Sequence, residues 1–93
     1  MIRSFQDKEA EKIFYGEQSL QLPQTIQKTA YRKLRMLHNT RELRDLSVFR
    51  GNHFEKLSGD RKSQYSICVN DQYRVCFEWR AGDAYNVEIV DYH

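Results

Sequence analysis

The sequence of 93 residues lacks several features that define whole classes of protein. It has two cysteines, one proline and four glycines, and it contains neither an internal repeat nor a low-complexity segment. It also has no long apolar run, so we expect no signal peptide and no membrane span, and the cytoplasm is the expected compartment. Its His, Cys and Asp residues are not clustered at the spacing of metal ligands. We therefore expect neither a metal site nor a cofactor.

What the sequence does contain is the composition of a small globular protein. Hydrophobic residues make up 40% and aromatic residues 13% of the chain, which is too much for disorder. The length suits one domain that covers residues 1–93. A domain this short buries roughly 60–65% of its unfolded surface, so a partner would add to its stability.

Charge is distributed unevenly along the chain. The net charge is only +2, but residues 24–62 hold ten basic and four acidic side chains, whereas residues 63–93 hold two basic and five acidic ones. A basic middle segment indicates a surface for a polyanion. A solvated helix face explains the same charges equally well.

The C-terminal part has the pattern of consecutive antiparallel strands. Residues 65–69, 73–79 and 87–93 are rich in β-branched and aromatic side chains and are separated by Gly, Asn and Asp. Alternation sends Arg74 to the face opposite the core, where no charged partner is evident. The side chains expected to face the core are Tyr73, Val75, Phe77 and Trp79, and on the last strand Tyr85, Val87 and Ile89.

A turn at residues 70–72 decides whether the two cysteines can pair. It puts Cys68 opposite Arg74 and Cys76 opposite Ser66, so the sulfur atoms are off register and cannot form a disulfide without backbone movement. We expect two buried thiols in a reduced compartment.

Two helices are expected before the strands. Asp7 can cap the first helix, which ends near Gly16. The second begins at Pro23, and His38 near its end is expected to compensate the helix dipole. It carries an apolar stripe at helical spacing, formed by Ile26, Ala30, Leu34 and Leu37. The other face holds Lys28, Arg32, Lys33 and Arg35. The last three could contact RNA, and a solvated helix face explains them at least as well.

Between the helices and the strands the pattern is less regular. Residues 41–49 are ambiguous, residues 50–52 signal a turn, and residues 53–58 are expected to form a strand. Residues 2–5 are expected to form a short first strand. The expected fold class is α+β, with two N-terminal helices packed on one face of a twisted antiparallel β-sheet.

Several of these segments together resemble a known family. The segments that carry the likeness are Gly59-Asp60-Arg61, residues 65–67, residues 69–77 and the terminal residues 87–93. They resemble the HigB toxins of bacterial type II toxin–antitoxin modules, which belong to the RelE/ParE superfamily. The first residues and the basic second helix also fit, so the likeness spans nearly the whole chain.

The resemblance implies a RelE-like fold with two helices on a twisted sheet. It implies an endoribonuclease that cuts messenger RNA in the decoding site of a translating ribosome. It also implies a HigA-like helix-turn-helix antitoxin, which binds the toxin, blocks it and joins it to operator DNA.

Cleavage of RNA without a metal needs a base for the 2′-hydroxyl, an acid for the leaving 5′-oxygen and cations for the phosphorane. His93 is the best acid or base candidate, because histidine titrates near neutral pH. Arg74 is the best phosphate clamp, because its fork matches two phosphate oxygens. Tyr92 can orient a phosphate or stack on a base, and Asp91 can orient a histidine or accept from an arginine. The resemblance implies the same four residues as the active site.

Two questions about the site stay open at this point. Strict alternation separates Tyr92 from Asp91 and His93, so the last strand would have to twist, bulge or end early to unite them. Some members of the family have a catalytic histidine where this chain has Glu55, with His53 two residues earlier. Either could be the second proton carrier, or neither.

Further basic residues could hold RNA around these strands. The candidates for substrate binding are Lys56, Arg61 and Lys62. Two other functions also fit the sequence: a non-catalytic inhibitor like the gyrase-poisoning branch of the superfamily, or a co-repressor that acts only with its antitoxin.

Overall fold

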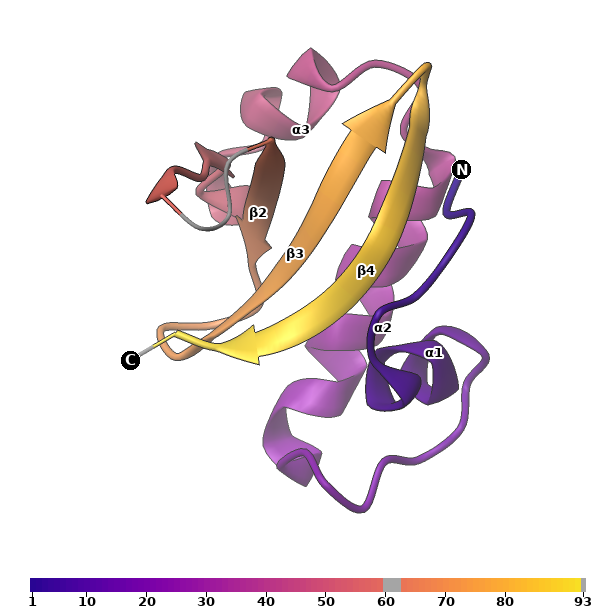
Figure 1. The fold of residues 1–93 in the computed structure, drawn as a ribbon. Coiled ribbons are helices and arrows are strands. Elements are labelled where there is room, and N and C mark those ends of the chain that lie inside the picture. Colours follow the sequence, from indigo (N-terminus) through magenta and orange to yellow (C-terminus); the bar gives the residue numbers. More distant parts are fainter. Residues whose placement is uncertain (60–62, 93) are drawn as a thin grey trace.

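Helices cover one face of a four-stranded antiparallel sheet in the computed structural model, which describes residues 1–59 and 63–92 (Figure 1). The strands lie in the order β1-β2-β3-β4, and each neighbouring pair is antiparallel. Their bounds are β1 (Glu55–Lys56), β2 (Gln64–Cys68), β3 (Tyr73–Arg80) and β4 (Asp83–Asp91). The predicted α+β class is therefore confirmed.

The two N-terminal helices follow the predicted pattern closely. α1 (Lys8–Phe14) starts after Asp7, whose carboxylate accepts a hydrogen bond of 2.9 Å from the Glu9 amide. It ends at Phe14, two residues before Gly16, whose φ of 81° is the left-handed conformation typical of the residue that follows a helix C-cap. α2 (Gln24–Asn39) begins one residue after Pro23, and its predicted apolar stripe is buried. In Figure 1 α2 runs behind β3 and β4.

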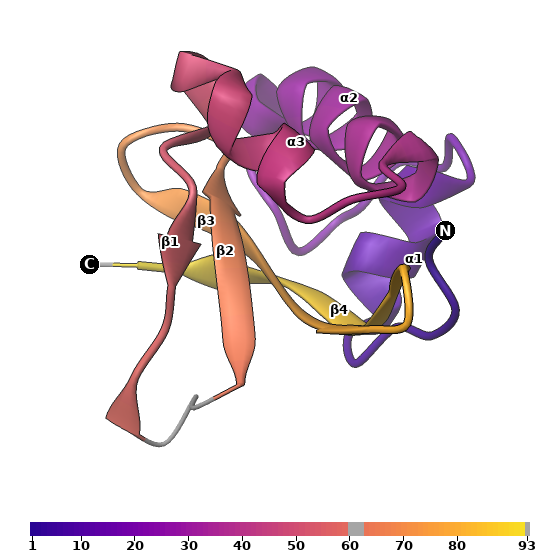
Figure 2. The ribbon, with the colours of Figure 1, turned by 90° about the horizontal axis from the view of Figure 1, so that it is seen from above.

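One lysine on the basic face of α2 is not exposed to solvent. Lys33 is buried, and its Nζ donates to Asn52 Oδ1 at 2.7 Å and to the Gly51 carbonyl at 3.2 Å. Burial lowers the pKa of Lys33. A solvated position for Lys33 is therefore wrong, because both acceptors belong to η1 (Arg50–Asn52). This turn follows α3 (Arg44–Val48), which lies on the same side of the sheet as α2 (Figure 2).

The prediction for His38 was also wrong. Its ring packs against Phe14 at 5.1 Å, and its Nδ1 accepts from the Ile2 amide at 3.2 Å. An imidazole nitrogen that accepts must be unprotonated, and burial together with the N-terminal ammonium lowers the pKa of His38. His38 therefore joins the N-terminal segment to α2 as a neutral group.

The strand predicted at residues 53–58 is shorter than expected. Its paired part is β1, where Glu55 lies opposite Ser66 and Lys56 opposite Tyr65. His53 adopts a left-handed φ of 41°, which interrupts the extended chain before β1. The strand expected at residues 2–5 is likewise reduced to two isolated parallel bridges with β4.

β3 and β4 form a long twisted hairpin that carries most of the sheet (Figure 1). A register shift between Cys76 and Glu78 coincides with a φ of 52° at Asn86, so β4 bulges there. The side chains of β4 that precede the bulge therefore point to the side of the sheet opposite to the one that strict alternation predicts. Ala84 is fully buried, while Tyr85 turns to the other face, contrary to the prediction for Tyr85.

The pairing of β2 with β3 agrees with the predicted register. Cys68 lies opposite Arg74 and Cys76 opposite Ser66, and both cysteines are thiols as predicted. Cys76 is buried, whereas Cys68 is only half-buried. Within the described residues, no helix is long and apolar enough to cross a membrane.

Candidate active site

Arg74 lies near the start of β3 and is buried on the sheet face opposite the helices. Its Nε donates to Ser66 Oγ at 2.7 Å, and its Nη2 donates to the Ser66 carbonyl at 3.4 Å. The same Nη2 also donates to the carbonyl of His53. These acceptors are uncharged, and the charged neighbour that sequence reasoning did not assign to Arg74 is Glu55. Three acceptors hold one side of the guanidinium in place, so its position is set before any ligand arrives.

The remaining nitrogen of this guanidinium faces a carboxylate. Arg74 Nη1 lies 4.0 Å from Glu55 Oε1, and the Glu55 side chain is 54% exposed. Glu55 reaches this face because it pairs with Ser66 across β1 and β2, and paired residues share a face. An exposed carboxylate thus stands beside an arginine nitrogen that has N–H groups to offer.

Tyr92 completes the group on this face. It follows β4, and its backbone N–H donates to the Gln72 carbonyl, which extends the strand pattern by one residue. Its ring centroid lies 5.9 Å from Arg74 Cζ, within the range of a cation–π contact. The side chain is exposed to solvent.

Asp91 lies on the other face. Its Cα pairs with Tyr73, whose side chain packs against the core, and its carboxylate accepts from Gln72 Nε2 at 3.0 Å. Alternation continues to the end of β4, so the structure does not bring Asp91 to Arg74. Of the predicted residues at the C-terminus, Tyr92 alone is placed at the arginine by the described part of the chain, and His93 lies outside it.

The other predicted residues take different positions. His53 is exposed and enters the site through its carbonyl oxygen, as the acceptor for Arg74. Lys56 pairs with Tyr65 and so lies on the face opposite Glu55. Arg61 and Lys62 lie outside the described residues.

Sequence reasoning missed Ser66 as part of the site. The predicted register already put Ser66 opposite Cys76 and Cys68 opposite Arg74, and both pairs share one face of the sheet. Diagonal neighbours on one face lie within reach of a long side chain. An arginine at position 74 and a hydroxyl at position 66 could therefore have been matched from the register.

The arrangement can position an anion and remove a proton. A phosphate oxygen can bind at Nη1 of a preset guanidinium, beside a carboxylate that can accept a proton and a tyrosine ring that can stack. Within the described residues, no group of three His, Cys, Asp or Glu side chains is placed to hold a metal ion.

The fold and this site define a class: a small RelE-like α+β protein whose sheet presents a buried arginine. Residues 3–93 match the family model of the RelE-like toxin HigB of type II toxin–antitoxin systems. The chain belongs to this HigB-like toxin family.

Two curated proteins are similar to this chain. The chain is 38% identical over 87 residues to Toxin HigB-1 of Vibrio cholerae serotype O1, with 92% of each chain covered. It is 32% identical over 73 residues to an uncharacterized protein of Haemophilus influenzae, with 78% of this chain and 72% of the relative covered. A toxin of this kind has an antitoxin as its partner.

Proposed function

We propose that this toxin is an endoribonuclease that cuts messenger RNA on the translating ribosome, in the cytoplasm, without a metal. The observation that supports it best is Arg74, which is buried, held by Ser66 and His53, and has its Nη1 4.0 Å from the exposed Glu55 carboxylate. A guanidinium whose position is fixed by several acceptors suits an anionic ligand. Its cognate antitoxin, a HigA-like helix-turn-helix protein, blocks the toxin and joins it to operator DNA.

Each step of the reaction has a candidate group. Arg74 binds a non-bridging oxygen of the scissile phosphate and stabilises the negative charge of the phosphorane. Glu55 takes the proton from the 2′-hydroxyl as that oxygen attacks phosphorus. The bond to the 5′-oxygen then breaks, His93 protonates that oxygen, and a 2′,3′-cyclic phosphate remains. Tyr92 stacks on a neighbouring base.

Glu55 is the stronger candidate for the base than His53. The Glu55 carboxylate lies beside Arg74 Nη1, whereas His53 serves Arg74 through its backbone. A general base contributes about 100-fold to 10,000-fold to a rate. Glu55→Gln should lower cleavage within that range, while Glu11→Gln, an exposed charge change on α1, should leave it unchanged.

The test is to map RNA 5′ ends after brief induction, with translation running and with translation blocked. We expect new ends inside translated messages only while ribosomes move, and we expect Arg74→Ala and His93→Ala to abolish both the cuts and the growth arrest. Full toxicity of both variants would show that the site is assigned wrongly. Growth arrest with intact messages and damaged DNA would instead indicate a non-catalytic gyrase inhibitor. A chain without toxicity in the absence of antitoxin would indicate a co-repressor.

A further inference from the structure

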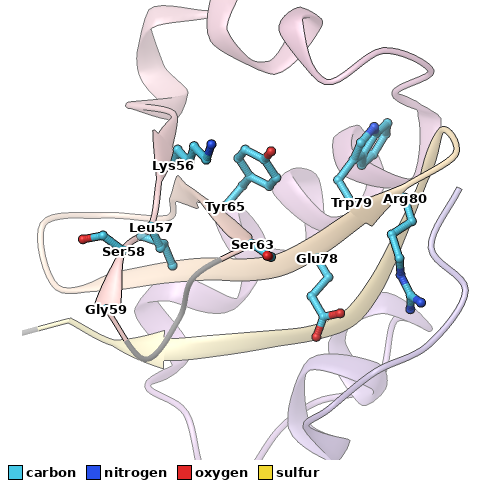
Figure 3. A pocket seen from close by; sticks show the side chains of 9 residues that line it. All are labelled: Lys56, Leu57, Ser58, Gly59, Ser63, Tyr65, Glu78, Trp79 and Arg80. Carbon is cyan, nitrogen blue, oxygen red and sulfur yellow. The ribbon is translucent and has the colours of Figure 1, made fainter.

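A hollow of about 810 Å³ lies at the far end of β3 from Arg74 (Figure 3). Trp79 follows Arg74 by five residues along β3, which corresponds to roughly 17 Å at the rise of an extended strand. The residues that line the hollow include Lys56, Ser63, Tyr65, Glu78, Trp79 and Arg80. The hollow is therefore separate from the candidate active site, although both belong to the same sheet.

Two aromatic side chains line this hollow and are held rigidly. The Tyr65 ring stacks on Phe54 with centroids 5.7 Å apart and an interplanar angle of 14°. The Trp79 ring meets Phe77 edge-on at 6.3 Å. Tyr65 and Trp79 are each only half-buried, and Figure 3 shows both on the same side of β3. The core fixes the rings while part of their surface stays accessible to a ligand.

Positive charge and hydroxyl groups accompany these rings. Lys56 and Arg80 are exposed, and Arg80 Cζ lies 4.1 Å from the Tyr85 ring, which steadies the guanidinium and leaves its N–H groups available. The one carboxylate among the described lining residues, Glu78, accepts from Asn86 Nδ2 at 2.9 Å. Lys56 thus lies with the two aromatic rings on one side of β3, while Glu78 and Arg80 extend to the other side (Figure 3).

We propose that this hollow is a second RNA site, which binds a single-stranded segment by base stacking on Trp79 and Tyr65 and by contact of Lys56 with a phosphate. Single-stranded nucleic acid is commonly held by this combination of rings and cations. The proposal rests on the ribonuclease function and adds where the RNA lies beyond the cleaved bond. Glu55 and Lys56 are adjacent on edge strand β1 and face opposite sides, so RNA that contacts both sites passes around that short edge.

Trp79 reports on this site directly, because it is the chain's single tryptophan. Titration of the purified toxin with a short single-stranded RNA should quench its fluorescence to saturation. Inorganic polyphosphate supplies charge without bases and should not quench it. Unchanged fluorescence with RNA, or equal quenching by polyphosphate, would overturn the proposal.

The same contact can be tested with variants of the toxin, whose affinity for labelled RNA is measured by fluorescence anisotropy. Trp79→Ala should weaken binding about fivefold to a hundredfold, while Trp79→Phe, which keeps a ring against Phe77, should retain most of the affinity. Lys56→Gln should lower the salt dependence by roughly 0.7 in slope, as one lost phosphate contact does for a single strand. Lys8→Gln removes an exposed charge on α1 and should change neither value. Equal effects of the Lys56 and Lys8 variants would contradict a phosphate contact.

The RNA in the hollow can come from the message or from the ribosome. Ultraviolet crosslinking of the toxin on translating ribosomes, followed by sequencing of the attached RNA, identifies which one it is. Crosslinks to protein alone would overturn the proposal. This result is independent of cleavage: a toxin that cuts messages but shows no RNA-dependent change at Trp79 refutes the second site only, and one that binds RNA without cutting refutes the nuclease only.

Discussion

Arg74 and Ser66 can be exchanged singly and together to measure how firmly the candidate active site is built. Ser66→Ala removes the acceptor that lies 2.7 Å from Arg74 Nε, and Arg74→Met removes the charge while keeping most of the side-chain volume. A hydrogen bond to a charged group contributes about 1.5–3 kcal/mol, more than a neutral one. Both partners are buried, so solvent cannot replace the lost bond.

The double-mutant cycle isolates this bond from the other contacts of Arg74. We expect a coupling of about 1.5–2.5 kcal/mol between the two positions. The free energy of unfolding is measured in urea, with Trp79 fluorescence as the signal. Arg74→Met alone should cost more than Ser66→Ala, because it also leaves the carbonyl of His53 without its donor.

Ser47 provides the matched control. Its hydroxyl donates to the Arg44 carbonyl, also at 2.7 Å, but the bond is exposed. Ser47→Ala should therefore cost less than about 0.5 kcal/mol. A coupling below about 0.5 kcal/mol between Arg74 and Ser66 would refute the argument that their buried hydrogen bond fixes the guanidinium in place. Equal losses of unfolding free energy for Ser66→Ala and Ser47→Ala would refute it as well.

Two further predictions concern the layer of helices. The folded chain keeps His38 neutral, because burial lowers its pKa, so the unfolded chain takes up the proton first as the pH falls. Stability should fall as the pH drops through about 6.5, the value of an unfolded histidine, and His38→Gln should flatten this part of the curve of unfolding free energy against pH. Asn52→Ala leaves the buried Lys33 ammonium without its 2.7 Å acceptor and the Leu46 carbonyl without its donor. We expect a loss of about 2–4 kcal/mol in urea unfolding, and a loss under about 1 kcal/mol would show that water replaces both bonds.

Local pattern was enough to predict most of the elements. Helical spacing identified the buried stripe of α2, and alternation assigned the faces of β3, because a regular element repeats its side-chain directions at a fixed period. The turn at residues 70–72 was equally predictable. Asn70 Oδ1 accepts from the amides of Gln72 and Tyr73, a local bond that needs no distant partner.

Local sequence pattern did not predict the burial of Lys33 or the face that Tyr85 occupies. The charge of Lys33 looked solvated, but it is covered by a segment that follows it by nearly twenty residues. Tyr85 changed faces because one residue, Asn86, takes a left-handed φ and shifts the register. A period assumes uniform backbone geometry, so it fails wherever a bulge or a covering loop intervenes.

The sequence by itself determined the class of fold, the family resemblance and the choice of Arg74 as the central residue. The tertiary structure decided which groups surround that residue, bringing Glu55, Ser66 and Tyr92 to it from three strands or their ends while leaving Asp91 on the other face. The physical reason is that residue type and spacing determine local conformation, whereas the neighbours of a side chain depend on strand register. Register is set by the packing of the whole sheet against its helices.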